Sequence, residues 1–160
     1  MNKPIINRKL ILLFIFSLLF LAGCVSHPFN SPAKQILSNP SWKKQRSQYE
    51  FSSGIIEVET DLHKKEIARN GLLNLNLLLE EENQEDPENR TQEALVSLYL
   101  REYAFMKNFK PLKSLTLHML IRDQEGRELG SYYFSTESKE SFYSSSYLFK
   151  QLKRGCGSLL

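Results

Sequence analysis

Histidine and cysteine are the residues of this 160-residue chain whose side chains most often carry chemistry, and there are three of one and two of the other. His27, His63 and His118 are far apart, so no two have a metal-ligand spacing. The sequence contains no Gly-x-Ser-x-Gly segment and no glycine-rich phosphate loop. His118 is predicted to lie on the outer face of a strand, with serine and threonine neighbours. It is the one residue that an enzyme hypothesis would have to use. We expect no catalytic, cofactor-binding or metal-binding residue, and no enzyme.

Cys24 ends a segment that is organised like a secretion signal. An apolar run, 10–22, leads through small residues to this cysteine. The basic residues that precede the run are Lys3, Arg8 and Lys9. The apolar core of a signal has about 7–15 residues, whereas a helix needs about 20 to cross a bilayer. We therefore expect residues 1–23 to be removed and not to span a membrane.

Leu21-Ala22-Gly23-Cys24 resembles the lipobox of bacterial lipoprotein precursors at every position. The resemblance implies that the Cys24 thiol receives a diacylglycerol, that cleavage falls between Gly23 and Cys24, and that the new amino group is acylated, for example with palmitate. Two or three fatty chains anchor a protein firmly, at about 0.8 kcal/mol for each buried methylene. An ordinary cleaved signal with a chance cysteine, or an uncleaved anchor, are the alternatives.

The residue after the cysteine bears on which membrane of the cell envelope would hold the protein. In the lipoprotein family an aspartate there tends to retain the product at the inner membrane of enteric-type bacteria, and this chain has Val25. The resemblance thus favours the outer membrane. Whether the protein faces the periplasm or the cell surface is left open. We expect a tether at 24–31, one globular domain at 32–155 and a tail at 156–160.

The charge balance excludes a nucleic-acid partner. The whole chain has 21 basic and 18 acidic residues, but three of the basic ones lie in the segment 1–23, which has no acid. Residues 24–160 therefore hold 18 of each sign. Binding to phosphates needs clustered positive charge. The only candidates are Lys43, Lys44 and Arg46, with Lys64 and Lys65, and we expect these to be ordinary solvated side chains.

Cys156 has no partner once Cys24 is lipidated. An odd cysteine outside the cytoplasm indicates a free thiol or an intermolecular disulfide. We expect an unpaired thiol on a frayed tail, and a disulfide-linked dimer is the alternative.

The first half of the domain gives mixed signals. Ser31-Pro32 favours one or two helical turns over 33–37, and Trp42 is expected to plug one end of the core. Residues 51–60 are β-branched with interleaved glutamates, which predicts a strand with one wet face. Leucines and asparagines alternate over 72–79 after Gly71, which favours a strand, although a helical stripe also fits. The acidic stretch 80–90 is expected to be a loop.

The second half predicts an antiparallel meander. Residues 94–105 are apolar on both faces, as a central strand would be, and 115–121 alternate with period two. Asp123-Gln124-Glu125-Gly126 is a hairpin turn whose glycine can adopt positive φ. Residues 138–154 then have helical spacing, and Gly155 and Gly157 are expected to end that helix.

These elements define an α+β fold, an antiparallel sheet of about four or five strands with a C-terminal helix on one face. An all-β sandwich is the alternative. The favoured function is a non-catalytic envelope lipoprotein, an accessory or assembly factor that docks on an unidentified protein partner. A second hypothesis is a binder of a small or apolar ligand between sheet and helix, and an enzyme is the third. The residues expected to line the ligand site are Tyr99, Tyr103, Phe134 and Phe149.

Overall fold

A computed structural model describes residues 33–38, 42–85 and 87–160. The proposed lipidation and cleavage site at Gly23 and Cys24, and the tether 24–31, lie outside these residues. The elements in chain order are β1 Ala33–Ser38, α2 Trp42–Gln45, the 3-10 turn η1 Arg46–Gln48, β2 Tyr49–Thr60, α3 Lys64–Gln84, the 3-10 turn η2 Pro87–Asn89, β3 Gln92–Lys107, β4 Lys110–Asp123, β5 Glu128–Ser138 and α4 Ser145–Leu159.

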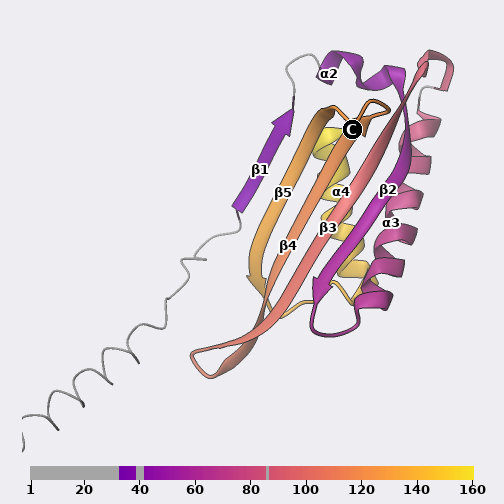
Figure 1. The fold of residues 1–160 in the computed structure, drawn as a ribbon. Coiled ribbons are helices and arrows are strands. Elements are labelled where there is room, and N and C mark those ends of the chain that lie inside the picture. The colour runs from indigo at the N-terminus through magenta and orange to yellow at the C-terminus, as the bar shows by residue number, and fades with distance from the viewer. Residues whose placement is uncertain (1–32, 39–41, 86) are drawn as a thin grey trace, which may run out of the picture. The chain divides into compact units, whose positions relative to one another are not determined.

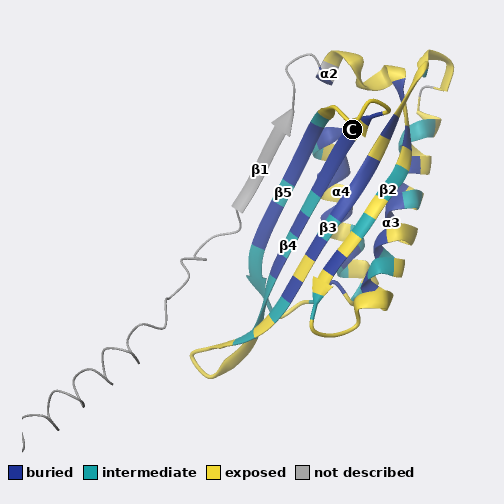
Figure 2. Cartoon of the chain, in the orientation of Figure 1, coloured by how far each residue is buried: buried dark blue, intermediate teal, exposed yellow. Residues whose placement is uncertain are grey.

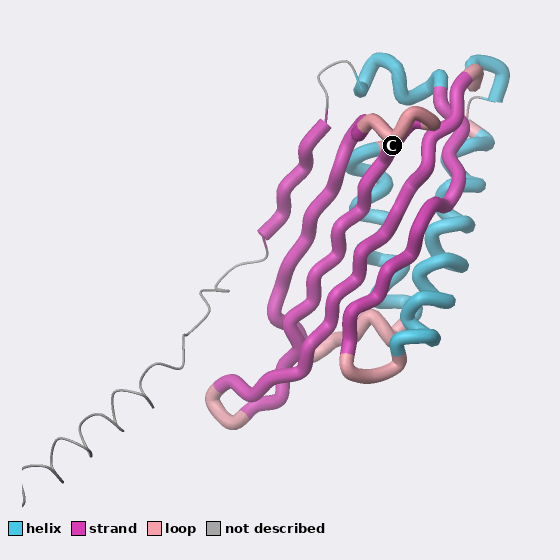
Figure 3. The backbone as a smooth tube through the Cα atoms, in the orientation of Figure 1, coloured by secondary structure: helices cyan, strands magenta, loops and turns pink. Residues whose placement is uncertain are grey.

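The strands form one five-stranded sheet in the order β1-β5-β4-β3-β2 (Figure 1). β3, β4 and β5 are the predicted antiparallel meander, and β1 adds to it antiparallel to β5. Both long helices lie on the same face of the sheet (Figure 3). The prediction of an α+β fold with a C-terminal helix on one face is confirmed.

β2 and β3 pair in parallel, and this pairing explains why the leucine-rich stretch is a helix. Neighbouring parallel strands cannot be joined by a hairpin and need a crossover connection, usually a helix. α3 is that crossover, so the strand predicted for 72–79 is wrong, and Gly71 lies inside the helix. The helix also takes up the first residues of the predicted loop 80–90 and ends at Gln84.

The turn between β4 and β5 has the predicted backbone geometry. Gly126 has a φ of 81°, in the left-handed region that glycine adopts without strain. The Asp123 carboxylate closes the turn by accepting hydrogen bonds from the backbone N–H groups of Glu125 and Arg127 at 3.0 and 2.8 Å.

The core lies between the sheet and the two helices (Figure 2). One face of each central strand points into it, as Leu98, Leu117 and Tyr132 do. Trp42 plugs one end of this core, as predicted: its side chain is 2% exposed, and its indole N–H donates to the carbonyl of Leu159 at 2.8 Å.

Two predictions about the ends of the domain are wrong. Residues 33–38 form strand β1 instead of helical turns, because their backbone pairs with the free edge of β5. α4 does not end at Gly155 but continues to Leu159, so the predicted tail 156–160 belongs to the helix and the core. At Gly155 α4 lies close against the sheet, since a Cβ there would lie 3.1 Å from the Met119 Cε and the Tyr132 ring.

Candidate functional site

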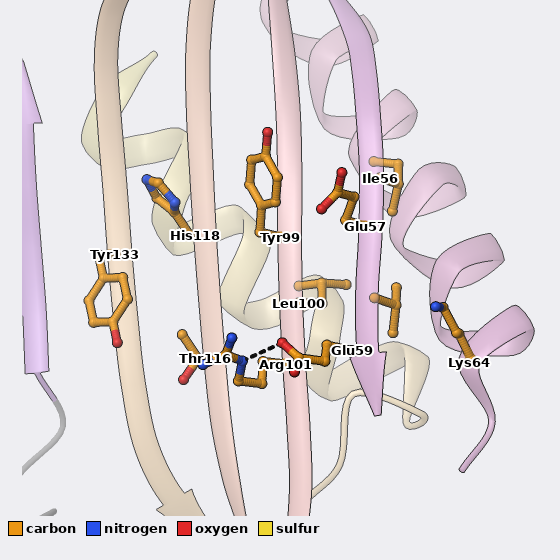
Figure 4. A pocket seen from close by; sticks show the side chains of 11 residues that line it. Ile56, Glu57, Glu59, Lys64, Tyr99, Leu100, Arg101, Thr116, His118 and Tyr133 are labelled. Carbon is orange, nitrogen blue, oxygen red and sulfur yellow. Dashed lines mark hydrogen bonds and ion pairs between the residues drawn. The ribbon is translucent and has the colours of Figure 1, made fainter. Parts of the chain in front are cut away.

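The sheet face that α3 and α4 leave uncovered carries a row of three rings. Tyr99 of β3 pairs with His118 of β4, and His118 pairs with Tyr133 of β5. Side chains on neighbouring strands at paired positions point to the same face. The three rings therefore stand side by side across the middle of the sheet (Figure 4).

His118 lies between the two tyrosines, and all three side chains are half-buried. The ring centroids of His118 and Tyr99 are 5.7 Å apart with the planes tilted by 32°. Tyr133 meets the imidazole on its other side at 6.3 Å, edge to face. Aromatic pairs attract each other at these separations. The prediction that His118 lies on an outer strand face is confirmed.

The edge strand β2 adds two carboxylates to this face. Glu57 continues the row beside Tyr99, and Glu59 pairs with Arg101 of β3. The Arg101 Nε lies 2.7 Å from the Glu59 Oε2, and the Tyr103 hydroxyl donates to the other carboxylate oxygen. These bonds, first that from Tyr103 and then that from Arg101, lower the pKa of Glu59. The same bond raises the pKa of Tyr103.

These residues surround a hollow of about 700 Å³ on the sheet (Figure 4). Its lining combines aromatic rings with an ion pair and a threonine hydroxyl, from Tyr99, His118, Tyr133, Arg101, Glu59 and Thr116. Rings supply apolar contact area, and the charged and hydroxyl groups supply directional hydrogen bonds, so such a surface is suited to binding. Among the described residues, no group of three or more His, Cys, Asp or Glu side chains could hold a metal ion.

The four aromatic residues expected to line a ligand site do not come together. Tyr99 and Tyr103 are on the open face, whereas Phe134 pairs with the buried Leu117 on the helix side, where Phe149 of α4 also packs. The space between sheet and helices is filled by core side chains. The hollow lies on the opposite face of the sheet from the site that the sequence suggested.

Glu57 and Arg101 are parts of this site that the sequence analysis missed. The alternation of residues 51–60 correctly predicts that the glutamates share a wet face. Which strand lies next to them depends on the parallel pairing of β2 with β3, and no local pattern announces that pairing.

Cys156 is not on a frayed tail. It is 7% exposed within α4, and burial, followed by the nearby Glu82 carboxylate, raises the pKa of its thiol to about 12. A disulfide-linked dimer would require this sulfur to leave the core. A non-reducing gel tests whether such a dimer forms.

No protein-family model matches the chain, and no curated protein does. Among solved structures, the chain is similar to the PelC dodecamer from Paraburkholderia phytofirmans, with a TM-score of 0.47 and 11% identity over 75% of this chain and 95% of that one. A point variant of the same dodecamer gives a TM-score of 0.45 and 7% identity over 76% and 94%. The class of this protein, α+β, rests on its own strand order and helices.

None of the helices among the described residues combines the length and the apolar character that a membrane span requires.

Proposed function

We propose that this protein is a lipid-anchored lipoprotein of the bacterial envelope, without catalytic activity of its own, that docks on a protein partner. The anchor is supported by the lipobox resemblance at Leu21 to Cys24. The outer membrane is the favoured location. The docking role is supported by the uncovered sheet face, and the absence of a recognisable catalytic motif in the sequence makes docking the simplest activity for such a domain.

The open sheet face is the single observation that carries the docking role. It presents the half-buried ring row of Tyr99, His118 and Tyr133, and further along β3 on the same face Leu95 is 44% exposed. Exposed apolar side chains gathered on one face of a small domain are typical of an interaction site. Tyrosine is enriched in the cores of protein interfaces, where its ring is buried and its hydroxyl bonds at the edge. The partner is therefore expected to cover this face.

The anchor is tested first, by membrane fractionation and mass spectrometry of the mature N-terminus, with Cys24→Ser as the comparison. The wild type should fractionate with membranes and begin at an acylated Cys24. The Cys24→Ser variant should carry no acyl mass. A wild-type protein that begins at Met1, or that leaves the membrane without acyl mass, would contradict the proposal.

The docking face is tested by affinity capture from detergent-solubilised membranes, with Cys24 intact. Wild type should retain a stoichiometric protein partner, and the double variant Tyr99→Ser with Tyr133→Ser should lose it. The matched control is Leu73→Ser with Leu77→Ser, which changes two leucines that are 56% and 58% exposed on α3. A partner lost with the leucine pair and retained with the tyrosine pair would place docking on α3. No stoichiometric partner at all would overturn the docking role.

A second candidate function is the binding of a small ligand, and the hollow beside His118 favours it. Its volume is within the range of ligand sites, about 300–1,000 Å³. The ligand would offer a flat apolar part to the rings and polar groups to Arg101 and Glu59. Under this hypothesis, a bound compound would shift the His118 ring resonances in NMR spectra, and His118→Ala would weaken its binding without unfolding the domain.

A further inference from the structure

The hairpin between β3 and β4 extends past the ends of β2 and β5 (Figure 1). Its end carries exposed apolar side chains. Phe109 at its tip is 98% exposed, and Met106 is 66% exposed. We propose that this tip inserts into the surface of the same membrane that holds the lipid anchor, a bilayer with anionic phospholipids. The inference rests on the proposed lipidation of Cys24.

The backbone of the tip is the first observation. Lys107 pairs with Lys110, which leaves Asn108 and Phe109 as a two-residue loop with φ values of 51° and 59°. Such a turn needs positive φ at both positions and favours Asn-Gly. Asparagine fits the first position, whereas a bulky side chain at the second is an outlier with a conformational cost. A glycine there would make a better turn, so the phenylalanine is explained by what its ring does and not by folding.

The charge of the hairpin is the second observation. Between Glu102 and Asp123 the sequence has no acidic residue, and this stretch includes Lys107, Lys110 and Lys113. In the structure Lys107 pairs with Glu137 and Lys113 pairs with Glu102. Lys110, directly after Phe109, is therefore the lysine with which the tip would meet a phosphate. Basic residues beside exposed apolar ones are typical of segments that bind at the interface of anionic membranes, where the ring enters the acyl boundary and the ammonium groups meet phosphates.

The direction in which the chain enters the sheet is the third observation. Ala33, the first residue of β1, pairs with Ser135, and Ser135 pairs with Thr116 of β4. β1 runs from there towards the β4–β5 turn, so its first residue, Ala33, is at the end of this strand that is nearer to the tip. An anchor on the chain before Ala33 would therefore draw that end of the sheet towards the membrane.

The length of the tether matches the distance that it must cover. Seven residues separate Phe109 from the level of Thr116 on β4, which at 3.3 Å each is about 23 Å. Nine residues separate Cys24 from Ala33, and fully extended they span at most about 30 Å. The tether is thus long enough for the tip to touch the membrane while Cys24 keeps its lipid in it. A tether of half that length would be shorter than these 23 Å, so the tip and a lipid on Cys24 could not both reach the membrane with the strands upright on it.

The test uses the lipidated full-length protein on vesicles of phosphatidylglycerol and phosphatidylcholine, with and without brominated acyl chains, which quench nearby tryptophan. Phe109→Trp places a reporter at the tip, and Met106→Trp places a second one at an ordinary strand position, so the test does not depend on folding of the first variant. The matched control is Glu125→Trp in the exposed β4–β5 turn at the other end of the sheet. Trp42 is buried and contributes equally to all three.

The emission of both tip reporters should shift to the blue and lose intensity on brominated vesicles, and that of Glu125→Trp should not. Replacing phosphatidylglycerol by phosphatidylcholine alone, or Lys110 by glutamine, should reduce the quenching. Flotation with acyl mass on Cys24 but no quenching of either tip reporter would overturn the inference and leave the proposed anchor intact. Equal quenching at Glu125, or quenching that does not depend on anionic lipid, would also overturn it. A protein without acyl mass would instead contradict the proposed function.

Discussion

Replacing Glu102 with alanine removes a buried carboxylate that joins the sheet to the loop before α4. Glu102 points to the helix side of β3 and is 7% exposed. Its oxygens accept hydrogen bonds from the Ser141 hydroxyl at 2.7 and 2.9 Å and from the backbone N–H of Phe142 at 2.8 Å. The Lys113 ammonium lies 2.7 Å away.

The cost of Glu102→Ala follows from these contacts. The buried N–H of Phe142 and the hydroxyl of Ser141 lose their acceptor, and a buried donor without a partner costs about 1–3 kcal/mol. Lys113 is a third exposed, so water replaces its lost partner and adds little to the cost. We expect a loss of about 2–4 kcal/mol in the free energy of unfolding. Glu102→Gln keeps an oxygen for the Phe142 N–H and should cost about 1 kcal/mol.

The assay is urea unfolding followed by the emission of Trp42, the only tryptophan of the chain. Glu59→Ala is the matched control, because Glu59 also lies 2.7 Å from a basic partner but is more than half exposed. Exposed ion pairs contribute little, so its unfolding midpoint should stay close to that of the wild type. If Glu102→Ala unfolds at the same urea concentration as Glu59→Ala, the reasoning from burial and unpaired donors is refuted.

Four further predictions test the backbone and the core. Gly126→Val should destabilise the protein by about 1–2 kcal/mol because of the positive φ, with Gly126→Asn costing less; equal unfolding midpoints would contradict this. Phe109→Gly should stabilise the protein by about 1 kcal/mol, because the ring is exposed and glycine adopts the positive φ of this turn without strain. A lower urea midpoint of unfolding for this variant would contradict a strained tip. Gly155→Val should destabilise the protein by about 1–3 kcal/mol, because the new side chain would overpack against Met119 and Tyr132. Gly157→Ala should stabilise it by about 0.5–1 kcal/mol, because the space around Gly157 is open and alanine favours the helix. The buried Cys156 thiol should resist thiol reagents until urea unfolds the protein, and fast labelling of the native protein would show that the thiol is accessible. Because the pKa of this thiol is higher in the folded state than in the unfolded state, the free energy of unfolding of the wild type should fall as the pH rises above about 8.5, more steeply than that of Cys156→Ala.

Local pattern was enough to predict the meander of β3, β4 and β5. Alternation of apolar residues, a two-faced apolar central strand and a turn with glycine are all short-range signals, and Gly126 has the conformation that the turn requires. The same kind of signal placed His118 on the outer face. The C-terminal helix was predicted as well, but its end was not. Glycine at position 155 does not mark the end of the helix; it is needed inside α4 because a side chain there would meet Met119 and Tyr132.

Residues 72–79 were misread because this helix carries leucines on both sides. Leu75, Leu78 and Leu79 are buried against the sheet, whereas Leu73 and Leu77 are mostly exposed. The exposed leucines remove the helical period from the pattern and leave an alternation that resembles a strand. The parallel pairing of β2 with β3 decides the matter, and it joins residues about 40 positions apart, beyond the range of any local pattern.

The geometry of the two proposals fits together. Lipidation would attach the protein to the membrane at a single residue, Cys24, however many acyl chains that residue carries. The domain would then remain free to change its orientation relative to the membrane. A second contact at Phe109 would remove most of that freedom, because β1 begins at its end nearer to the tip. The strands of the sheet would then run towards the bilayer, and the ring row of Tyr99, His118 and Tyr133 would face sideways along the membrane surface.

A partner anchored in the same membrane could reach that face without displacing the tip. Tip variants should therefore weaken capture of the partner only when both proteins are on a membrane. Loss of capture by tip variants in detergent as well would indicate that the tip contacts the partner itself.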